Sequence, residues 1–239
     1  MDLSHIDQHS LGKHFELLVL DDYSEASIRQ KCAKARQYNL RGVIAGPLWL
    51  PALVEELSGS GVMVGSGVSF PYGLDTPKVK ALATEELIQL GAVTIDLKMN
   101  VAALKADKTT VVEDELRLFA QVAKGVETKV IIEVCHLTDA EIHTACNMVV
   151  EAGLGWVKSS TGQFEGPSME QVAIILRSLK GTPVKAKVSG VKFPHPQNAF
   201  AFLAAGVEII GSQKVFGILD AFSLLRELGV VPGGNTQGS

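Results

Sequence analysis

Eight short apolar runs, each followed by a polar turn and a longer segment of helical periodicity, are the feature that most limits the fold of this chain. The strand-like runs begin at Glu16, Arg41, Val62, Val93, Lys129, Leu154, Pro183 and Val207. Many of the helical segments start at Ser, Thr, Asp or Pro and stop at Gly or Asn. An open doubly wound sheet usually has about five or six strands, whereas eight such units match a TIM-type (β/α)8 barrel. The pattern therefore predicts an α/β, single-domain barrel over residues 1–230, with a flexible C-terminal tail at 231–239.

Composition excludes several classes of partner and compartment. The chain has 239 residues, 46% apolar and 20% charged, which suits one sizeable core, and a net charge of -4 leaves no basic surface for nucleic acid or an acidic membrane. Its three cysteines, Cys32, Cys135 and Cys146, form no CxxC pair, which argues against disulfides and structural zinc. No export signal and no apolar run of membrane-spanning length is present. We expect a cytoplasmic protein with no membrane or nucleic-acid partner.

Polar side chains at the carboxyl ends of the predicted strands are the candidate site, because barrel active sites lie at that end. Residues two apart in a strand share a face. By this rule the shared faces carry Asp96, Lys98 and Asn100; Glu133 and Cys135; and Lys185, Lys187 and Ser189, while Lys158 ends the sixth run. Four lysines and two carboxylates at one mouth would be costly as unpaired charges, so some must pair and others must be neutral.

Lys158 differs from an ordinary strand-end lysine, which commonly extends to solvent. It follows the bulky Trp156 and Val157 and precedes a Ser-Ser-Thr-Gly turn. A lysine that ends a buried strand can lose its proton, and the neutral amine is a nucleophile that forms Schiff bases with carbonyls.

The other candidates also have structural interpretations. Asp96 suits an ion pair as well as proton transfer, Glu133 suits a structural partner, and His136 a loop or capping residue. Cys135 has no activating base beside it in sequence and is interpreted as a packing residue.

Across nearly its whole length the chain resembles the deoxyribose-phosphate aldolases, which are class I aldolases of barrel fold. Matching strings, in the family's order and spacing, include NLRGVIAGPLWLP, FPYGLDTPKVKALATEELIQLGAVTIDLKMNVAALKA, KVIIEVCHLTDAEI, GLGWVKSSTGQFEGPSMEQVAIILRSL and AFLAAGVEIIGSQKV. The family's Schiff-base lysine lies in VKTSTG, here VKSSTG, which implies Lys158. Its second lysine, in VKASGG, corresponds to Lys187, and its proton-relay aspartate, in EIDMVIN, corresponds to Asp96.

The resemblance implies a Schiff-base mechanism that needs no metal or other cofactor. Lys187 would depress the pKa of Lys158, which would attack the donor carbonyl, and Asp96 with Lys187 would move the protons. The implied partners are a small aldehyde or sugar phosphate and, for the protein itself, a second copy in a homodimer.

The phosphate-binding pattern of the family is altered in this chain. The family grips phosphate with glycine-rich loops after the last three strands. The corresponding candidates for substrate or phosphate binding are Thr161, Gly162, Gly190, Gly211, Ser212, Lys98, Lys192 and Lys214. Val191, Gln213 and Lys214 replace a glycine and serines, and Phe193 takes the place of a basic residue.

Two further departures lie near the chemistry. The family's early IDHTLL aligns with HFELLV, which puts Phe15 and Glu16 where an aspartate and a histidine usually stand. Lys98 replaces an apolar residue and is expected to face inward with Asp96, either neutralising it or binding an anion. Lys185, two residues from Lys187, could share or compete for the place of second cation.

Three hypotheses result. The favoured one is a class I aldolase acting on deoxyribose 5-phosphate. The second is a diverged Schiff-base lyase whose carbonyl substrate lacks phosphate or carries a carboxylate. The third is a non-catalytic, ligand-binding barrel, against which the retention of Lys158, Lys187 and Asp96 counts.

Overall fold

Eight parallel strands close into one barrel in the computed structural model, which describes residues 1–231. The strands are β1 (Phe15–Val19), β2 (Gly42–Ala45), β3 (Met63–Val68), β4 (Thr94–Lys98), β5 (Glu127–Ile131), β6 (Trp156–Lys158), β7 (Lys185–Ser189) and β8 (Ile209–Ser212). Each pairs with its neighbours in chain order, and β1 closes the ring against β8 with Phe15 opposite Ile210. All eight predicted strands are present, and the predicted barrel is confirmed.

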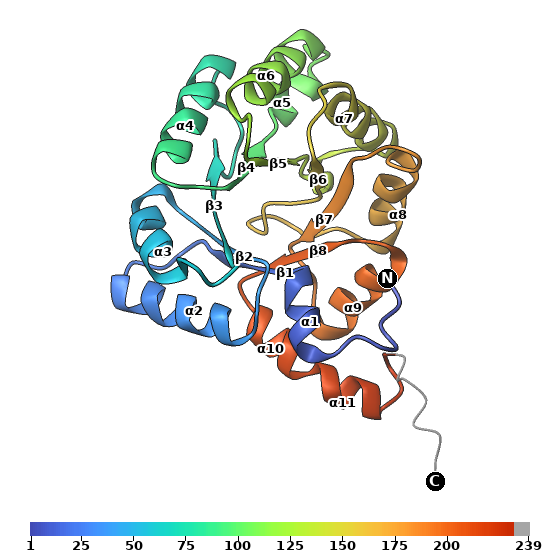
Figure 1. The fold of residues 1–239 in the computed structure, drawn as a ribbon. Coiled ribbons are helices and arrows are strands. Elements are labelled where there is room, and N and C mark those ends of the chain that lie inside the picture. The colour runs from blue at the N-terminus through green and yellow to red at the C-terminus, as the bar shows by residue number, and fades with distance from the viewer. Residues whose placement is uncertain (232–239) are drawn as a thin grey trace.

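Helices form a ring outside the strands (Figure 1). They are α1 (Gln8–Leu11), α2 (Glu25–Gln37), α3 (Leu50–Leu57), α4 (Pro77–Gln89), α5 (Val101–Lys105), α6 (Thr109–Val122), α7 (Asp139–Glu151), α8 (Met169–Ser178), α9 (His195–Ala205), α10 (Val215–Asp220) and α11 (Phe222–Glu227), with the 3-10 turns η1 (Gly12–His14), η2 (Pro47–Trp49) and η3 (Val134–His136). Thr138 and Ser168 close capping boxes that fix the starts of α7 and α8. The segment after β8 forms two short helices, α10 and α11.

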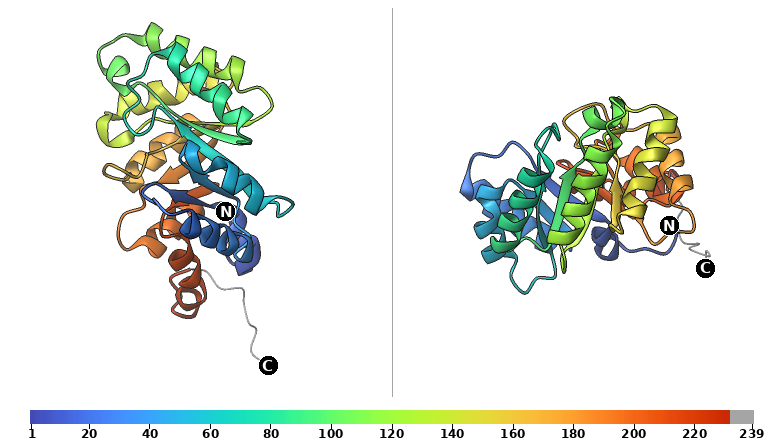
Figure 2. Two further views of the ribbon diagram at one scale, coloured as in Figure 1. Left: turned by 90° about the vertical axis from the view of Figure 1, so that its left-hand side faces the viewer. Right: turned by 90° about the horizontal axis from the view of Figure 1, so that it is seen from above.

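The alternation of side chains along each strand separates an apolar layer from a polar interior. Along β4, Ile95 and Leu97 belong to the buried apolar core, whereas Thr94 and Asp96 contact lysines from other strands. The apolar core thus lies between strands and helices, and the side views of Figure 2 show these helices along the flanks of the barrel. Polar groups are concentrated on the barrel axis.

The two ends of the described chain both pack against the last helices. The amino group of Met1 donates to the carbonyl of Leu203 in α9 at 3.0 Å. Val231 is buried and its N–H donates to the carbonyl of Leu225, so this first residue of the predicted tail is held against α11. The remainder of that prediction, residues 232–239, lies outside the described residues. No helix within 1–231 has the length and apolar character needed to cross a membrane.

A buried ion pair fastens the helices beside β4. Lys80 of α4 donates to the Glu115 carboxylate of α6, and both side chains are almost completely enclosed. Lys80 also donates to the Lys98 carbonyl at 2.8 Å, and the other Glu115 oxygen accepts from the Asn100 N–H at 3.0 Å. The pair therefore anchors α4 and α6 to the carboxyl end of β4.

Loss of one partner should be far more costly here than in an exposed pair. Glu115→Ala leaves the Lys80 ammonium buried without its counter-ion, so we expect the free energy of unfolding to fall by about 3–5 kcal/mol in urea titrations. Asp114→Ala, at the next position of α6, breaks an exposed pair with Arg117 and should cost less than about 1 kcal/mol. Equal losses in the two variants would contradict this assignment.

Candidate active site

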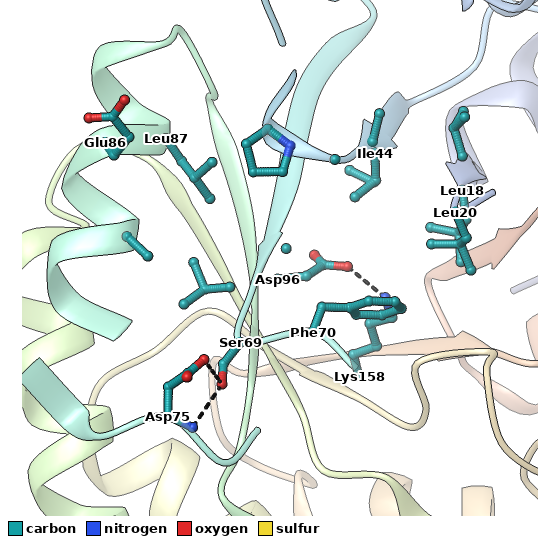
Figure 3. A pocket seen from close by; sticks show the side chains of 17 residues that line it. Leu18, Leu20, Ile44, Ser69, Phe70, Asp75, Glu86, Leu87, Asp96 and Lys158 are labelled. Carbon is teal, nitrogen blue, oxygen red and sulfur yellow. Dashed lines mark hydrogen bonds and ion pairs between the residues drawn. The ribbon is translucent and has the colours of Figure 1, made fainter. Parts of the chain in front are cut away.

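Lys158 ends β6 deep inside the mouth of the barrel. Its side chain is only 2% exposed, and its Nζ donates to Oδ2 of Asp96 at 2.7 Å. Trp156, two residues earlier on the same face, fills the other end of the barrel, where Arg41 and Lys185 lie over its ring. The strand therefore supplies a wide apolar base at Trp156 and then the amine of Lys158, and Figure 3 shows this amine hydrogen-bonded to Asp96.

Asp96 and Lys187 lie close to Lys158 and form a triad with it. The sequence analysis predicted that these three residues would lie near one another. Lys158 and Lys187 are register partners on the adjacent strands β6 and β7. Lys187 donates to the same Oδ2 of Asp96 at 2.8 Å, so one carboxylate oxygen bridges two amines. The other oxygen, Oδ1, is buried and has no hydrogen-bond partner among residues 1–231.

Two further buried charges belong to this cluster: Glu16, which the sequence analysis noted only as a departure near the chemistry, and Lys129, which it missed. Glu16 of β1 is fully buried; its Oε2 accepts from Lys187 Nζ at 2.5 Å and its Oε1 lies 3.3 Å from Lys129 Nζ. Lys129 of β5 also donates to Glu127 at 2.5 Å and to the Thr94 hydroxyl. The alternation of side chains along β1 and β5 was the signal that could have identified both residues. Phe15 packs outward on the ring of Phe200, so the next residue, Glu16, points inward.

Burial and neighbouring charges shift the pKa values of the two central lysines, Lys158 and Lys187, in opposite directions. The pKa of Lys158 is lowered to about 8, chiefly by burial and to a smaller extent by the Lys187 charge, and the opposing attraction of Asp96 is too weak to restore it. Burial also acts against charge on Lys187, but Asp96 and Glu16 outweigh it and raise its pKa. Burial would raise the pKa of Asp96, yet Lys158, Lys187 and Lys129 hold it well below its usual range. Of these two lysines, Lys158 is thus the one with a neutral fraction near pH 7.

An apolar cavity of about 470 Å³ opens onto Lys158 and Asp96. Its wall comes from the ends of β1, β2 and β3 and from α4, and it includes Leu18, Leu20, Ile44, Phe70 and Leu87. Figure 3 shows the Phe70 ring beside Lys158. Such a wall keeps water from the amine, which is the physical origin of the desolvation.

The loops predicted to bind phosphate lie outside the lining of this cavity. Gly162 and Gly190 adjoin each other with φ of 85° and 73°, a conformation that favours glycine. Thr161 is buried, where its N–H donates to Glu133 and its hydroxyl accepts from the Gln163 N–H. Gly211 leaves room for Lys187, whose Cε would lie 3.1 Å from an added Cβ.

The predicted basic residues of those loops are held by neighbours on the surface. Lys192 forms an ion pair with Glu165 at 2.6 Å, and Lys214 Nζ lies 3.0 Å from the His195 ring. The Ser212 hydroxyl accepts from the Lys214 N–H at 3.0 Å. These residues surround the carboxyl ends of β7 and β8, as expected from the sequence.

Three sequence predictions are corrected by the structure. Lys185 is not a second cation, because it stands at the amino end of β7, pairs with Glu208 and faces the opposite end of the barrel. Lys98 is buried at the mouth but forms no ion pair with Asp96 within residues 1–231. Glu133 and Cys135 share no strand face, since β5 ends at Ile131 and Glu133 takes a left-handed conformation with φ of 51°.

Comparison with known proteins agrees with this geometry. No protein-family model matches the chain. A deoxyribose-phosphate aldolase of Geobacillus sp. (strain WCH70) is 36% identical over 204 residues, covering 85% of this chain and 91% of the relative. One of Bacteroides thetaiotaomicron is also 36% identical over 204 residues, covering 84% and 85%. The chain belongs to the deoxyribose-phosphate aldolase family.

A solved structure described as a putative deoxyribose-phosphate aldolase from Coccidioides immitis superposes with a TM-score of 0.87 at 25% identity, covering 93% of this chain and 89% of that one. In the present chain, the VKSSTG string covers the end of β6 and the turn that follows it. Among residues 1–231, no group of three or more His, Cys, Asp and Glu side chains is arranged to hold a metal ion.

Chemical labelling should separate the two central lysines. Because the pKa of Lys158 is about 8 and that of Lys187 is raised above its ordinary 10.5, trace acetylation read by peptide mass spectrometry should modify Lys158 with a midpoint near pH 8. Lys187 serves as an internal control and should stay unlabelled at that pH. Equal labelling of both lysines with a midpoint near pH 10 would contradict the assignment.

Proposed function

We propose that this protein is a class I aldolase that reversibly cleaves 2-deoxy-D-ribose 5-phosphate to acetaldehyde and glyceraldehyde 3-phosphate, with Lys158 as the Schiff-base residue. The observation that carries the proposal is the buried Lys158 amine, with a pKa of about 8, held by Asp96 beside a second ammonium at the base of a cavity. About a tenth of such an amine is neutral at pH 7, against less than about a thousandth at the ordinary pKa.

In the cleavage direction, neutral Lys158 attacks the C1 aldehyde carbon and forms a carbinolamine. Loss of water, with a proton supplied to the leaving hydroxyl, gives an iminium between Nζ and C1. Removal of the C3 hydroxyl proton lets the C2–C3 bond break. Its electron pair flows toward the iminium nitrogen, releasing glyceraldehyde 3-phosphate and leaving an enamine. Protonation at C2 and addition of water then return acetaldehyde and the free lysine.

Asp96 and Lys187 are suited to move these protons. Asp96 Oδ1 has no hydrogen-bond partner within residues 1–231 and only a distant ion pair with Lys129 at 3.9 Å, so it can accept a proton while Oδ2 stays bonded to Lys187. Lys187 keeps its proton because Asp96 and Glu16 raise its pKa, which makes it a fixed positive charge and a proton donor beside the reacting carbon. Glu16 positions Lys187 without reaching the cavity.

The phosphate is assigned to the loops after β6, β7 and β8. The turns at Gly162 and Gly190 adjoin each other, and Lys192 and Lys214 lie after β7 and β8. Both lysines are exposed and held only by surface contacts, so a phosphate dianion can compete for them at small cost. The homodimer and the cytoplasmic location remain predictions from the sequence.

Borohydride trapping tests the proposal. Incubation with acetaldehyde and reduction should add an ethyl group to Lys158 in the wild type, found by peptide mass spectrometry, and deoxyribose 5-phosphate should be cleaved in preference to deoxyribose. Lys158→Met should lose the adduct and about 10⁴-fold or more of the cleavage rate. The control Lys185→Met, at the other end of the barrel, should retain both. An unmodified Lys158 in the wild type would exclude the proposed mechanism.

Asp96→Asn should separate Schiff-base formation from proton transfer. Removal of the carboxylate takes away the attraction that raises the Lys158 pKa, so this pKa should fall below about 8 and trapping by acetaldehyde should persist. Cleavage should nevertheless slow by about 10²–10⁴-fold because the proton acceptor is gone. Steady-state rates and adduct yields measured on one preparation check both parts. Loss of the adduct in a folded variant would show that Asp96 is needed for amine attack itself.

A further inference from the structure

Lys98 is a buried ammonium with no counter-ion, in a pocket outside the site described above. Its side chain is 2% exposed, and its only hydrogen bond within residues 1–231 runs from Nζ to the Met99 carbonyl at 3.2 Å. Every other lysine buried to this degree, Lys80, Lys129, Lys158 and Lys187, has a carboxylate within 3 Å among the described residues. Lys98 therefore lacks the compensation that a buried cation requires.

The neighbouring carboxylates are committed elsewhere. Glu133 and Glu115 both favour the charged form of Lys98, but burial outweighs them and lowers its pKa to about 8. The Glu133 carboxylate accepts from the Thr161 N–H at 3.0 Å, which supports the turn after Lys158. Glu115 is paired with Lys80. Neither carboxylate lies within 4.0 Å of the Lys98 amine, so the positions around its Nζ are open to an anion from outside the protein.

The space beside Lys98 can hold such a partner. A pocket of about 300 Å³ is lined by Lys98 together with Pro71, Tyr72, Val101, His136 and Phe164. The Phe164 ring packs edge-on against both Tyr72 and His136, at centroid distances of 6.0 and 5.1 Å. Lys105 also lines the pocket, but it is exposed and bound to Glu141, which leaves Lys98 as the buried lysine of the lining without an ion pair within residues 1–231. One such charge within aromatic and aliphatic walls suits a monoanionic carboxylate on a short carbon chain better than a phosphate dianion.

The pocket shares the barrel mouth with Lys158. Lys98 is paired in register with Ile131, and Ile131 with Lys158, so the two lysines stand at one level, two strands apart. Two strand spacings correspond to roughly 10 Å between backbones. The loop after β3 borders both spaces, since Phe70 lines the Lys158 cavity while Pro71 and Tyr72 line the Lys98 pocket.

We propose that Lys98 binds the carboxylate of a carbonyl acid whose carbonyl carbon is held at Lys158, with two or three carbons between the two groups. The inference rests on the proposed Schiff-base function and extends it to a substrate class that the phosphate loops do not serve. The carboxylate displaces no existing ion pair, because Lys98 has none within residues 1–231.

Competitive trapping with a pair of aldehydes of equal carbon number tests this inference. Succinic semialdehyde and butanal share an aldehyde and a chain length and differ only in the terminal carboxylate. Wild-type Lys158 should be trapped with succinic semialdehyde about 10- to 100-fold more efficiently than with butanal, the range for a charge-assisted hydrogen bond. Lys98→Met, which keeps the length and apolar stem, should bring that ratio near one, and Lys98→Arg should retain much of it.

Lys105→Met is the matched control. Lys105 also lines the pocket, but it is 44% exposed and its charge is bound to Glu141, so the ratio should keep its wild-type value. Circular dichroism melts establish that each variant is folded. If acetaldehyde traps Lys158 while the ratio is near one in the wild type, or is unchanged in folded Lys98→Met, the inference is overturned and the aldolase proposal stands. If acetaldehyde traps nothing, both are overturned.

Discussion

The structure depends on one carboxylate oxygen that accepts from two buried amines. Oδ2 of Asp96 lies 2.7 Å from Lys158 and 2.8 Å from Lys187, and without it the buried Lys187 charge would stand beside Lys158 with no carboxylate between them. The charged groups around it come from five different strands, β1, β4, β5, β6 and β7. In an open sheet, side chains from five such strands would not meet at one point. The site therefore requires the closed barrel.

Burial and neighbouring charge act differently on the two central lysines. The resemblance implied that Lys187 depresses the pKa of Lys158, and its charge does so, but desolvation by the apolar wall is the larger cause. Lys187 is equally buried and yet retains its proton, because it has a second carboxylate in Glu16. One additional ion pair thus makes the difference between a nucleophile and a fixed cation on adjacent strands.

Sequence periodicity predicted the strands, the barrel and the convergence of Lys158, Lys187 and Asp96, because these features follow from the alternation of buried positions. It could not predict how far along each strand a residue stands. Lys185 has the same parity as Lys187 but lies at the other end of the barrel, where Glu208 pairs with it. Glu133 follows a break after Ile131 that no apolar pattern reveals. Glu16 was obscured because its significance lies in a contact 171 residues away in the chain.

The mouth of the barrel combines two kinds of surface, which suit different kinds of chemistry. The ends of β1 to β3 present an apolar wall to Lys158, which favours its neutral form. The loops after β7 and β8 present glycines and exposed lysines, which favour a mobile, hydrated anion such as phosphate. Lys98, at the end of β4, belongs to neither surface, since it is as buried as Lys158 but has no Asp96 of its own. When Lys98 is protonated, its charge has no ion pair within residues 1–231, and a bound carboxylate would supply one.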